Sequence, residues 1–161
     1  MHNRKLVIIS IILLIIIGNV FIPPNGYSFL SPCFSIAGVI YWIIKRTYLL
    51  DNYLIFLLGL LNDLFTGTPI GSSSLFYFLV KESIFLLEIR LKKSGIIFDL
   101  VKYIFGLTVY FSLIYIFIII YFENYTSISY FLMSYLLTLF IFPIIYIILN
   151  WIESKMRQDQ A

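Results

Sequence analysis

The chain has 161 residues, of which 61% are apolar and only 12% are charged, with a formal net charge of +3 and a mean hydropathy of +1.01. Soluble domains hold about 45 to 50% apolar and about 25% charged residues, so this composition is typical of an integral membrane protein. Six bilayer spans of roughly 20 residues would use about 120 residues. The remaining ~40 residues exclude, within this chain, a soluble domain that binds nucleotides, nucleic acid or extracellular ligands.

Apolar runs separated by charged or helix-breaking segments predict an all-α, polytopic fold with six transmembrane helices and short loops, in a single membrane domain over 1–161. The expected spans are 6–22, 29–44, 49–66, 70–91, 96–122 and 128–152. At 1.5 Å per residue the third span measures only about 25 Å, and we expect it to end below the outer surface. The last two spans exceed the length that a bilayer requires, and we expect them to tilt or to begin outside the hydrocarbon.

The basic residues indicate an orientation, because Lys and Arg concentrate in cytoplasmic loops. With the N-terminus inside, the three outer loops hold no basic residue, and ten of the 11 fall on the inner side. These ten are Arg4, Lys5, Lys45, Arg46, Arg90, Lys92, Lys93, Lys102, Lys155 and Arg157. The eleventh, Lys81, lies within the fourth span. We therefore expect both termini to be cytoplasmic.

Aromatic residues at the predicted span ends are typical of rings anchored at the level of the lipid headgroups. Trp42 and Trp151 fall at inner ends, and Tyr27, Tyr121 and Tyr125 fall at outer ends. A nucleic-acid stacking surface is excluded as an explanation for these rings, because the basic residues are not interleaved with them on one soluble face. The lipid bilayer, and no nucleic acid, is the expected environment.

Ionisable groups inside a membrane are expensive, which makes them candidate functional sites. Asn62 and Asp63 lie near the outer end of the third span, before a turn in which Thr68 and Pro69 have the pattern of an N-cap and a first helical residue. If Asp63 folds back against this turn, its carboxylate accepts hydrogen bonds from the free amides around 70–72 that open the fourth span. That role is structural, and a partner-binding role and an ion-coupled role are the alternatives.

The second candidate site is the pair Lys81 and Glu82 in the middle of the fourth span. Helical spacings of 3 and 4 align a polar stripe along this span, consisting of Ser74, Tyr77, Lys81, Ile84 and Glu88. Such a stripe faces protein or water rather than lipid. It either packs against other spans of this chain or receives a partner. Glu88 also has Lys92 four residues later, the spacing of a helical ion pair.

Two further charges, Asp99 and Lys102, open the fifth span, where we expect their long stems to reach the inner surface. Residue sets for catalysis are absent from the sequence. The only histidine is His2, no phosphate-binding loop of the GxxxxGK type occurs, and no second aspartate lies at the depth of Asp63 in the membrane to pair with it. We therefore expect a protein that is not an enzyme and that holds no metal ion or cofactor.

The segment 58–71, LGLLNDLFTGTPIG, follows a span ending in Tyr41 and Trp42 and a short basic loop. It resembles the family of the rod shape-determining protein MreD. Four residues match the family motif in order and spacing: Gly59, Asp63, Gly67 and Gly71. With their neighbours they define the expected motif, which comprises Gly59, Asn62, Asp63, Gly67, Thr68, Pro69 and Gly71. The chain length and the six expected spans agree with the resemblance.

The resemblance implies a non-catalytic, multi-pass subunit of the bacterial inner membrane that serves cell elongation. It would bind an MreC-like bitopic scaffold and, through it, a RodA-like glycosyltransferase, its penicillin-binding protein and MreB filaments. The alternative is the membrane subunit of a small-molecule transporter, of the type that binds substrate in vitamin uptake. In that case a polar cavity near Asp63, Ser72 to Ser74 and Tyr77 would hold the ligand.

Overall fold

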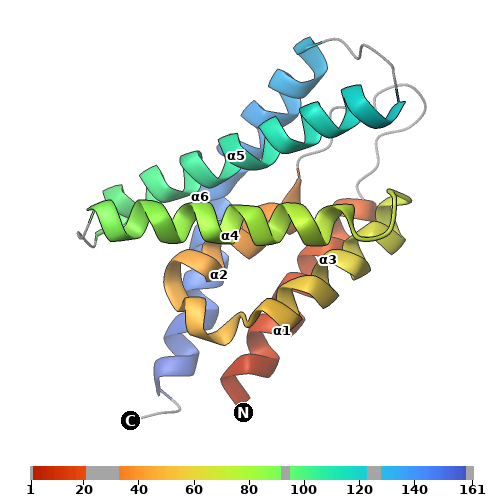
Figure 1. Ribbon diagram of the computed structural model, residues 1–161. Helices are drawn as coiled ribbons and strands as arrows, with labels where there is room; N and C mark the ends of the chain where they lie inside the picture. Colours follow the sequence, from red (N-terminus) through yellow and green to blue (C-terminus); the bar gives the residue numbers. More distant parts are fainter. Residues whose placement is uncertain (1, 21–32, 92–94, 123–127, 159–161) are drawn as a thin grey trace.

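The computed structural model describes residues 2–20, 33–91, 95–122 and 128–158. Within these ranges every regular element is a helix (Figure 1). The elements are α1 (His2–Val20), α2 (Phe34–Arg46), the 3-10 turn η2 (Thr47–Leu49), α3 (Asn52–Thr66), α4 (Ser72–Leu91), α5 (Ile96–Phe122) and α6 (Ile128–Gln158). The expected all-α class is thus confirmed.

The helix bounds follow the expected spans closely, with differences at the ends. α5 coincides with the expected 96–122, and α6 continues six residues past 152 to Gln158. α3 begins at Asn52 rather than at 49, because the 3-10 turn occupies the preceding residues. α2 has 13 residues and α3 has 15, which correspond to about 20 Å and about 22 Å at 1.5 Å per residue. Both are shorter than the roughly 30 Å of a hydrocarbon core.

Two of the described helices are long and apolar enough to cross a bilayer, judged by length and composition. Their apolar segments are Ile96–Tyr121 in α5 and Phe131–Met156 in α6. Within an 18-residue apolar window of each segment, only 28% of the residues in the first and 22% in the second are buried inside the protein, so most of these residues are at least partly exposed. Large exposed apolar surfaces mark contact with a partner or a membrane, and these two helices are therefore compatible with a membrane protein.

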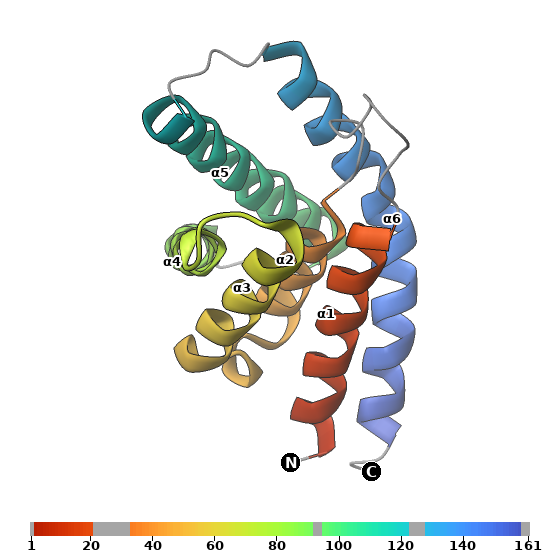
Figure 2. The ribbon, with the colours of Figure 1, turned by 90° about the vertical axis from the view of Figure 1, so that its right-hand side faces the viewer.

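The helices cross at steep angles instead of forming a parallel bundle. Figure 2 shows α1 and α6 running side by side along the page while α4 is seen end-on. α4 packs against α3 on one side and α5 on another. In both views the start of α1 and the end of α6 lie at the same end of the molecule. This arrangement places the hairpin between α3 and α4 at the edge of the fold.

The centre of the fold is α2, which contacts α1, α4, α5 and α6. Its residues 36–43 are all buried, as expected for a helix that is apolar on every side. Trp42 is 0% exposed, and its indole Nε1 donates to Ser10 Oγ of α1 at 2.9 Å. The expectation that Trp42 is a headgroup anchor is therefore wrong, because its polar atom is satisfied inside the core. Trp151 is exposed with Lys155 Nζ over its ring, whereas Tyr27 and Tyr125 lie outside the described residues.

Candidate functional site at the hairpin between α3 and α4

The hairpin begins where Gly67 ends α3 in the left-handed conformation, with φ of 69°. Its backbone N–H donates to the carbonyl of Asp63 at 2.9 Å, which satisfies one of the free carbonyls at the helix end. Thr66 donates its hydroxyl to the carbonyl of Asn62 at 2.9 Å. A glycine is favoured at position 67 because residues with a Cβ rarely adopt a positive φ.

Gly59 lets α3 and α4 approach each other closely. A Cβ built on Gly59 would lie 2.3 Å from Ser74 Cα and 2.4 Å from Ser74 N, which is closer than real atoms come. Ser74 then donates its hydroxyl to the carbonyl of Phe56 at 2.8 Å. One turn along α3, Asn62 Nδ2 donates to Ser73 Oγ at 2.9 Å. The backbones of the two helices are thus brought into contact by the absence of a side chain at Gly59 and held there by two hydrogen bonds from short polar side chains.

The Asp63 carboxylate is 1% exposed and accepts four hydrogen bonds. Oδ2 accepts the backbone N–H of Gly71 at 2.7 Å. Oδ1 accepts the backbone N–H of Ser73 at 3.1 Å and the hydroxyls of Thr68 and Ser72 at 2.8 and 3.2 Å. The donors include an amide in the stretch 70–72 where the sequence predicts one. A carboxylate with this many donors is stabilised without a counter-ion.

The carboxylate of Asp63 caps the N-terminus of α4, a role that the side chain of an N-cap residue usually has. α4 begins at Ser72, after a turn in which Gly71 has φ of 98° and Ser72 N donates to Pro69 O at 3.1 Å. The expectation that Thr68 is the N-cap and Pro69 the first helical residue is therefore wrong. The free amides belong to Gly71 and Ser73. The carboxylate of Asp63, on the neighbouring helix α3, accepts their hydrogen bonds and lies next to the positive end of α4.

The polar stripe of α4 contacts elements of this chain over most of its length. Ser74, Tyr77 and Ile84 are buried. Lys81 Nζ donates to Leu50 O at 2.9 Å and to Asn52 Oδ1 at 2.7 Å, both at the start of α3. The ammonium of Lys81 therefore meets neutral oxygens rather than Asp63.

The remaining acidic residues of α4 have different surroundings. Glu82 is exposed and lies on the side of α4 that faces away from the other helices. Glu88 Oε1 accepts a hydrogen bond from Lys102 Nζ at 3.0 Å, whereas Lys92, its expected partner, lies outside the described residues. Lys102 is 4% exposed, so the expectation that its side chain reaches the inner surface is wrong.

A cluster of ion pairs that sequence reasoning missed joins α2, α4, α5 and α6 at the other end of α4. Lys45 Nζ lies 2.6 Å from Asp99, and Arg46 Nε lies 3.3 Å from Glu153. Glu153 is 3% exposed and also accepts the Tyr41 hydroxyl at 3.3 Å. We refer to Lys45, Arg46, Glu88, Asp99, Lys102 and Glu153 as the charged cluster; they line a cavity of about 610 Å³.

The charge of Lys45 is stabilised within this cluster. Burial opposes the charge, but the hydrogen bonds to Asp99 and Tyr146 outweigh it, so the pKa of Lys45 is raised above its ordinary value. Its ammonium also lies 5.2 Å from the centre of the Tyr146 ring. The sequence places charges of both signs near the inner ends of several spans, but it does not indicate which of them meet.

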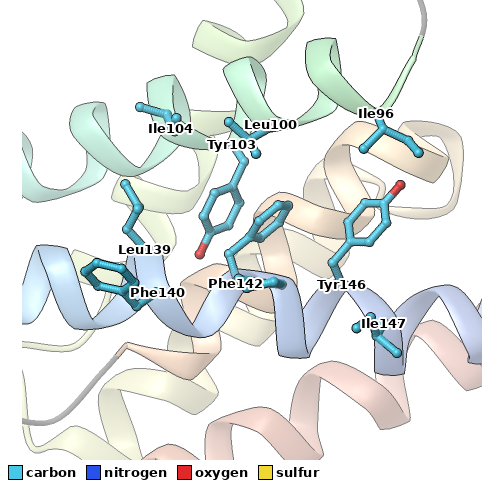
Figure 3. A pocket seen from close by; sticks show the side chains of 10 residues that line it. Ile96, Leu100, Tyr103, Ile104, Leu139, Phe140, Phe142, Tyr146 and Ile147 are labelled. Carbon is cyan, nitrogen blue, oxygen red and sulfur yellow. The ribbon is translucent and has the colours of Figure 1, made fainter.

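An apolar groove of about 390 Å³ runs between the first turns of α5 and the middle of α6 (Figure 3). Figure 3 shows Tyr103, Phe142 and Tyr146 between the two helices. Tyr103 and Phe142 stack with ring centres 3.7 Å apart, and the Tyr103 hydroxyl donates to the Thr138 carbonyl at 3.1 Å. The groove walls consist of aliphatic and aromatic side chains, and the polar side-chain groups among the lining residues are the hydroxyls of Tyr103 and Tyr146.

Within the part of the chain that the structure describes, no three His, Cys, Asp or Glu residues come together in a way that could hold a metal ion. The oxygens of Asp63, the most buried carboxylate near the hairpin, are taken by protein donors. Comparison with known proteins adds no relative: no protein-family model, curated protein or solved structure matches this chain.

Proposed function

We propose that this protein is a non-catalytic, six-span subunit of the bacterial inner membrane that serves cell elongation by binding an MreC-like bitopic scaffold. The observation that carries the proposal is the hairpin of Gly59, Asp63, Gly67 and Gly71. These residues of the MreD-like motif provide, in turn, the close approach of two helices, the acceptor for free amides, the end of α3 and the turn before α4. A motif that builds a hairpin fits a protein that presents a shape to partners.

The six-span arrangement is supported by two further features. The start of α1 and the end of α6 lie at the same end of the molecule, as an even number of crossings requires (Figures 1 and 2). The outward apolar surfaces of α5 and α6 suit lipid.

The role of a transporter subunit has less support. Its expected cavity includes Asp63 as the acidic group, and the carboxylate of Asp63 is already held by four protein donors. A small molecule that stays bound through purification and is lost on substitution of Ser73 or Tyr77 would favour that function instead.

Two experiments test the proposal. In a variant without Cys33, single cysteines at Asn25, Thr68 and Asn124 are expected to react with an impermeant thiol reagent added outside intact cells. Cysteines at Ser94 and Gln160 are expected to react only after the membrane is opened. Labelling of Ser94 in intact cells would contradict the six-span arrangement.

The second experiment concerns the partner. An MreC-like scaffold with its membrane span is expected to copurify with this protein in detergent, and its periplasmic domain alone is expected to bind weakly. Depletion of the protein is expected to make rod-shaped host cells round. Equal binding with and without the scaffold span, or unchanged cell shape, would contradict the proposed function.

A further inference from the structure

The outward side of α4 is an apolar stripe with one acidic residue at its centre. Its exposed residues recur at helical spacing and form what we refer to as the Glu82 face: Leu75, Phe78, Leu79, Glu82, Phe85, Leu86 and Ile89. The exposed fractions of the apolar members run from 37% for Leu79 to 61% for Leu86. The other sides of α4 contact α3, α5 and α2, so this face of the helix is the one that the described residues leave uncovered.

Glu82 has no ion pair or hydrogen bond with any described residue, in contrast to the other charges nearby. Lys81 beside it is turned toward α3, where it donates to Leu50 O and Asn52 Oδ1. Glu88 is held by Lys102. The described chain therefore supplies no donor to the carboxylate of Glu82.

The position of Glu82 makes this lack of a donor significant. Glu82 lies ten residues after the start of α4 and nine before its end, which is about 15 Å and about 14 Å at 1.5 Å per residue. If α4 spans the bilayer, the carboxylate faces the middle of the hydrocarbon. Ionisable groups at this depth are placed toward protein or water and are paired. The apolar residues around Glu82 exclude water, so a protein partner is the remaining means of pairing its carboxylate.

We propose that the Glu82 face binds a single transmembrane helix of another protein, and that this helix carries a Lys or Arg near its midpoint. The inference rests on the proposed membrane arrangement and identifies the surface by which the protein binds a bitopic partner. The apolar residues on either side of Glu82 pack against the apolar surface of that helix. The basic side chain supplies both the donor and the positive charge that the carboxylate requires.

Other occupants satisfy the face less well. A lipid tail covers the apolar residues but offers no donor. A second copy of this chain would bring two Glu82 carboxylates together, and like charges at close range repel each other. A neutral polar side chain provides a hydrogen bond but leaves the charge of Glu82 uncompensated. A basic residue in a partner helix is the occupant that matches both properties.

The test uses the full-length protein reconstituted in phosphatidylcholine vesicles with synthetic leucine-rich transmembrane helices. One helix carries a central lysine, and the other carries leucine at that position. Energy transfer between dyes on the protein and the helix measures binding. The lysine helix is expected to bind the wild-type protein roughly tenfold more tightly than the leucine helix. This preference is expected to disappear in Glu82→Gln and Glu82→Leu and to persist in Glu88→Gln, a control that removes the same charge six residues away.

Three results would overturn the proposal: equal binding of the two helices by the wild-type protein, an unchanged preference in Glu82→Leu, or pairing of the wild-type protein with itself that depends on Glu82. Helix content and elution volume identify any variant that does not fold, and Glu82→Gln, which preserves shape, is then decisive. Copurification of the scaffold is measured separately. Scaffold binding that survives Glu82→Leu refutes this surface alone. Failure of the wild-type protein to retain the scaffold refutes the proposed function alone.

Discussion

The molecule holds buried carboxylates in two different ways at two ends of α4. At the hairpin, Asp63 is surrounded by backbone amides and hydroxyls, all from residues 68–73. In the charged cluster, Asp99 and Glu153 meet Lys45 and Arg46, which are 54 and 107 positions away in the chain. The hairpin site therefore forms locally, whereas the charged cluster exists only after four helices have assembled.

Because of this difference, substitutions in the two regions are expected to affect stability in different ways. A carboxylate held by neutral donors leaves those donors unsatisfied when it is removed, and each buried donor then carries a penalty. A paired charge can be removed together with its partner, and replacing a whole buried pair by apolar residues is often neutral. The hairpin is therefore expected to tolerate no apolar substitute at Asp63, and the charged cluster to tolerate paired replacement.

The largest effect is expected for Asp63→Leu. It leaves three buried or partly buried donors without an acceptor: the amides of Gly71 and Ser73 and the hydroxyl of Ser72. At about 1 to 3 kcal/mol for each, the folded state should lose about 4 kcal/mol or more. The protein should fail to accumulate in the membrane, as measured by immunoblot of the membrane fraction. Leu64→Ala, at an exposed neighbouring position, is the control and should accumulate normally. Normal accumulation of Asp63→Leu would show that the hairpin does not depend on this carboxylate.

Gly59→Leu should be the next most severe change, with a loss of about 3 kcal/mol or more, because its side chain would collide with the backbone of Ser74. Thermal unfolding in detergent, followed by circular dichroism, measures the effect. Gly18→Ala is the control, since a Cβ there meets Phe34 at 3.6 Å, an ordinary contact. Similar melting temperatures for the two variants would mean that α3 and α4 are not in close contact at Gly59.

In the charged cluster, Glu153→Leu should lose about 2 kcal/mol, because it leaves the partly buried Arg46 and the Tyr41 hydroxyl without their acceptor. Arg46→Met combined with Glu153→Leu should recover part of that loss. The same thermal assay on the single and double variants gives the coupling between the two positions. A double variant that is less stable than Glu153→Leu would show that the charged cluster does not tolerate paired replacement. The two regions would then not differ in this respect.

The smallest effect is expected for Thr68→Val, which removes one of the four donors to Asp63 and leaves three in place. The free energy of unfolding should fall by about 1 kcal/mol. Ser112→Ala, at an exposed position of α5 where the hydroxyl bonds to its own helix, is the control. A loss as large as that of Asp63→Leu would mean that the hydroxyl, and not the amides, organises the hairpin.

The features that the sequence predicts are those that depend on local contacts, as at the hairpin, and not on long-range contacts, as in the charged cluster. The helix count, most helix bounds and one of the two amide donors to Asp63, Gly71, were accessible, because they depend on local spacing and on breakers such as Gly67 and Gly71. The burial of Trp42 and Lys102 was not, because it depends on which helices meet. A lysine near a span end has the same sequence pattern whether it extends to the surface or pairs with Glu88. The first residue of α4 was mispredicted because its capping carboxylate comes from another helix.

The most direct test of the account is Asp63→Asn, which removes the charge but keeps one oxygen. This oxygen can still accept the Ser73 amide and the hydroxyls of Thr68 and Ser72, whereas the acceptor for the Gly71 amide is lost. Its level in the membrane, its scaffold binding and its ability to maintain rod shape are measured together in cells that lack the wild-type protein. If Asp63 organises the hairpin, the variant should accumulate, assemble and support rod shape to a large extent. A variant that accumulates and assembles normally but leaves the cells round would show that the charge itself acts, and would contradict the account.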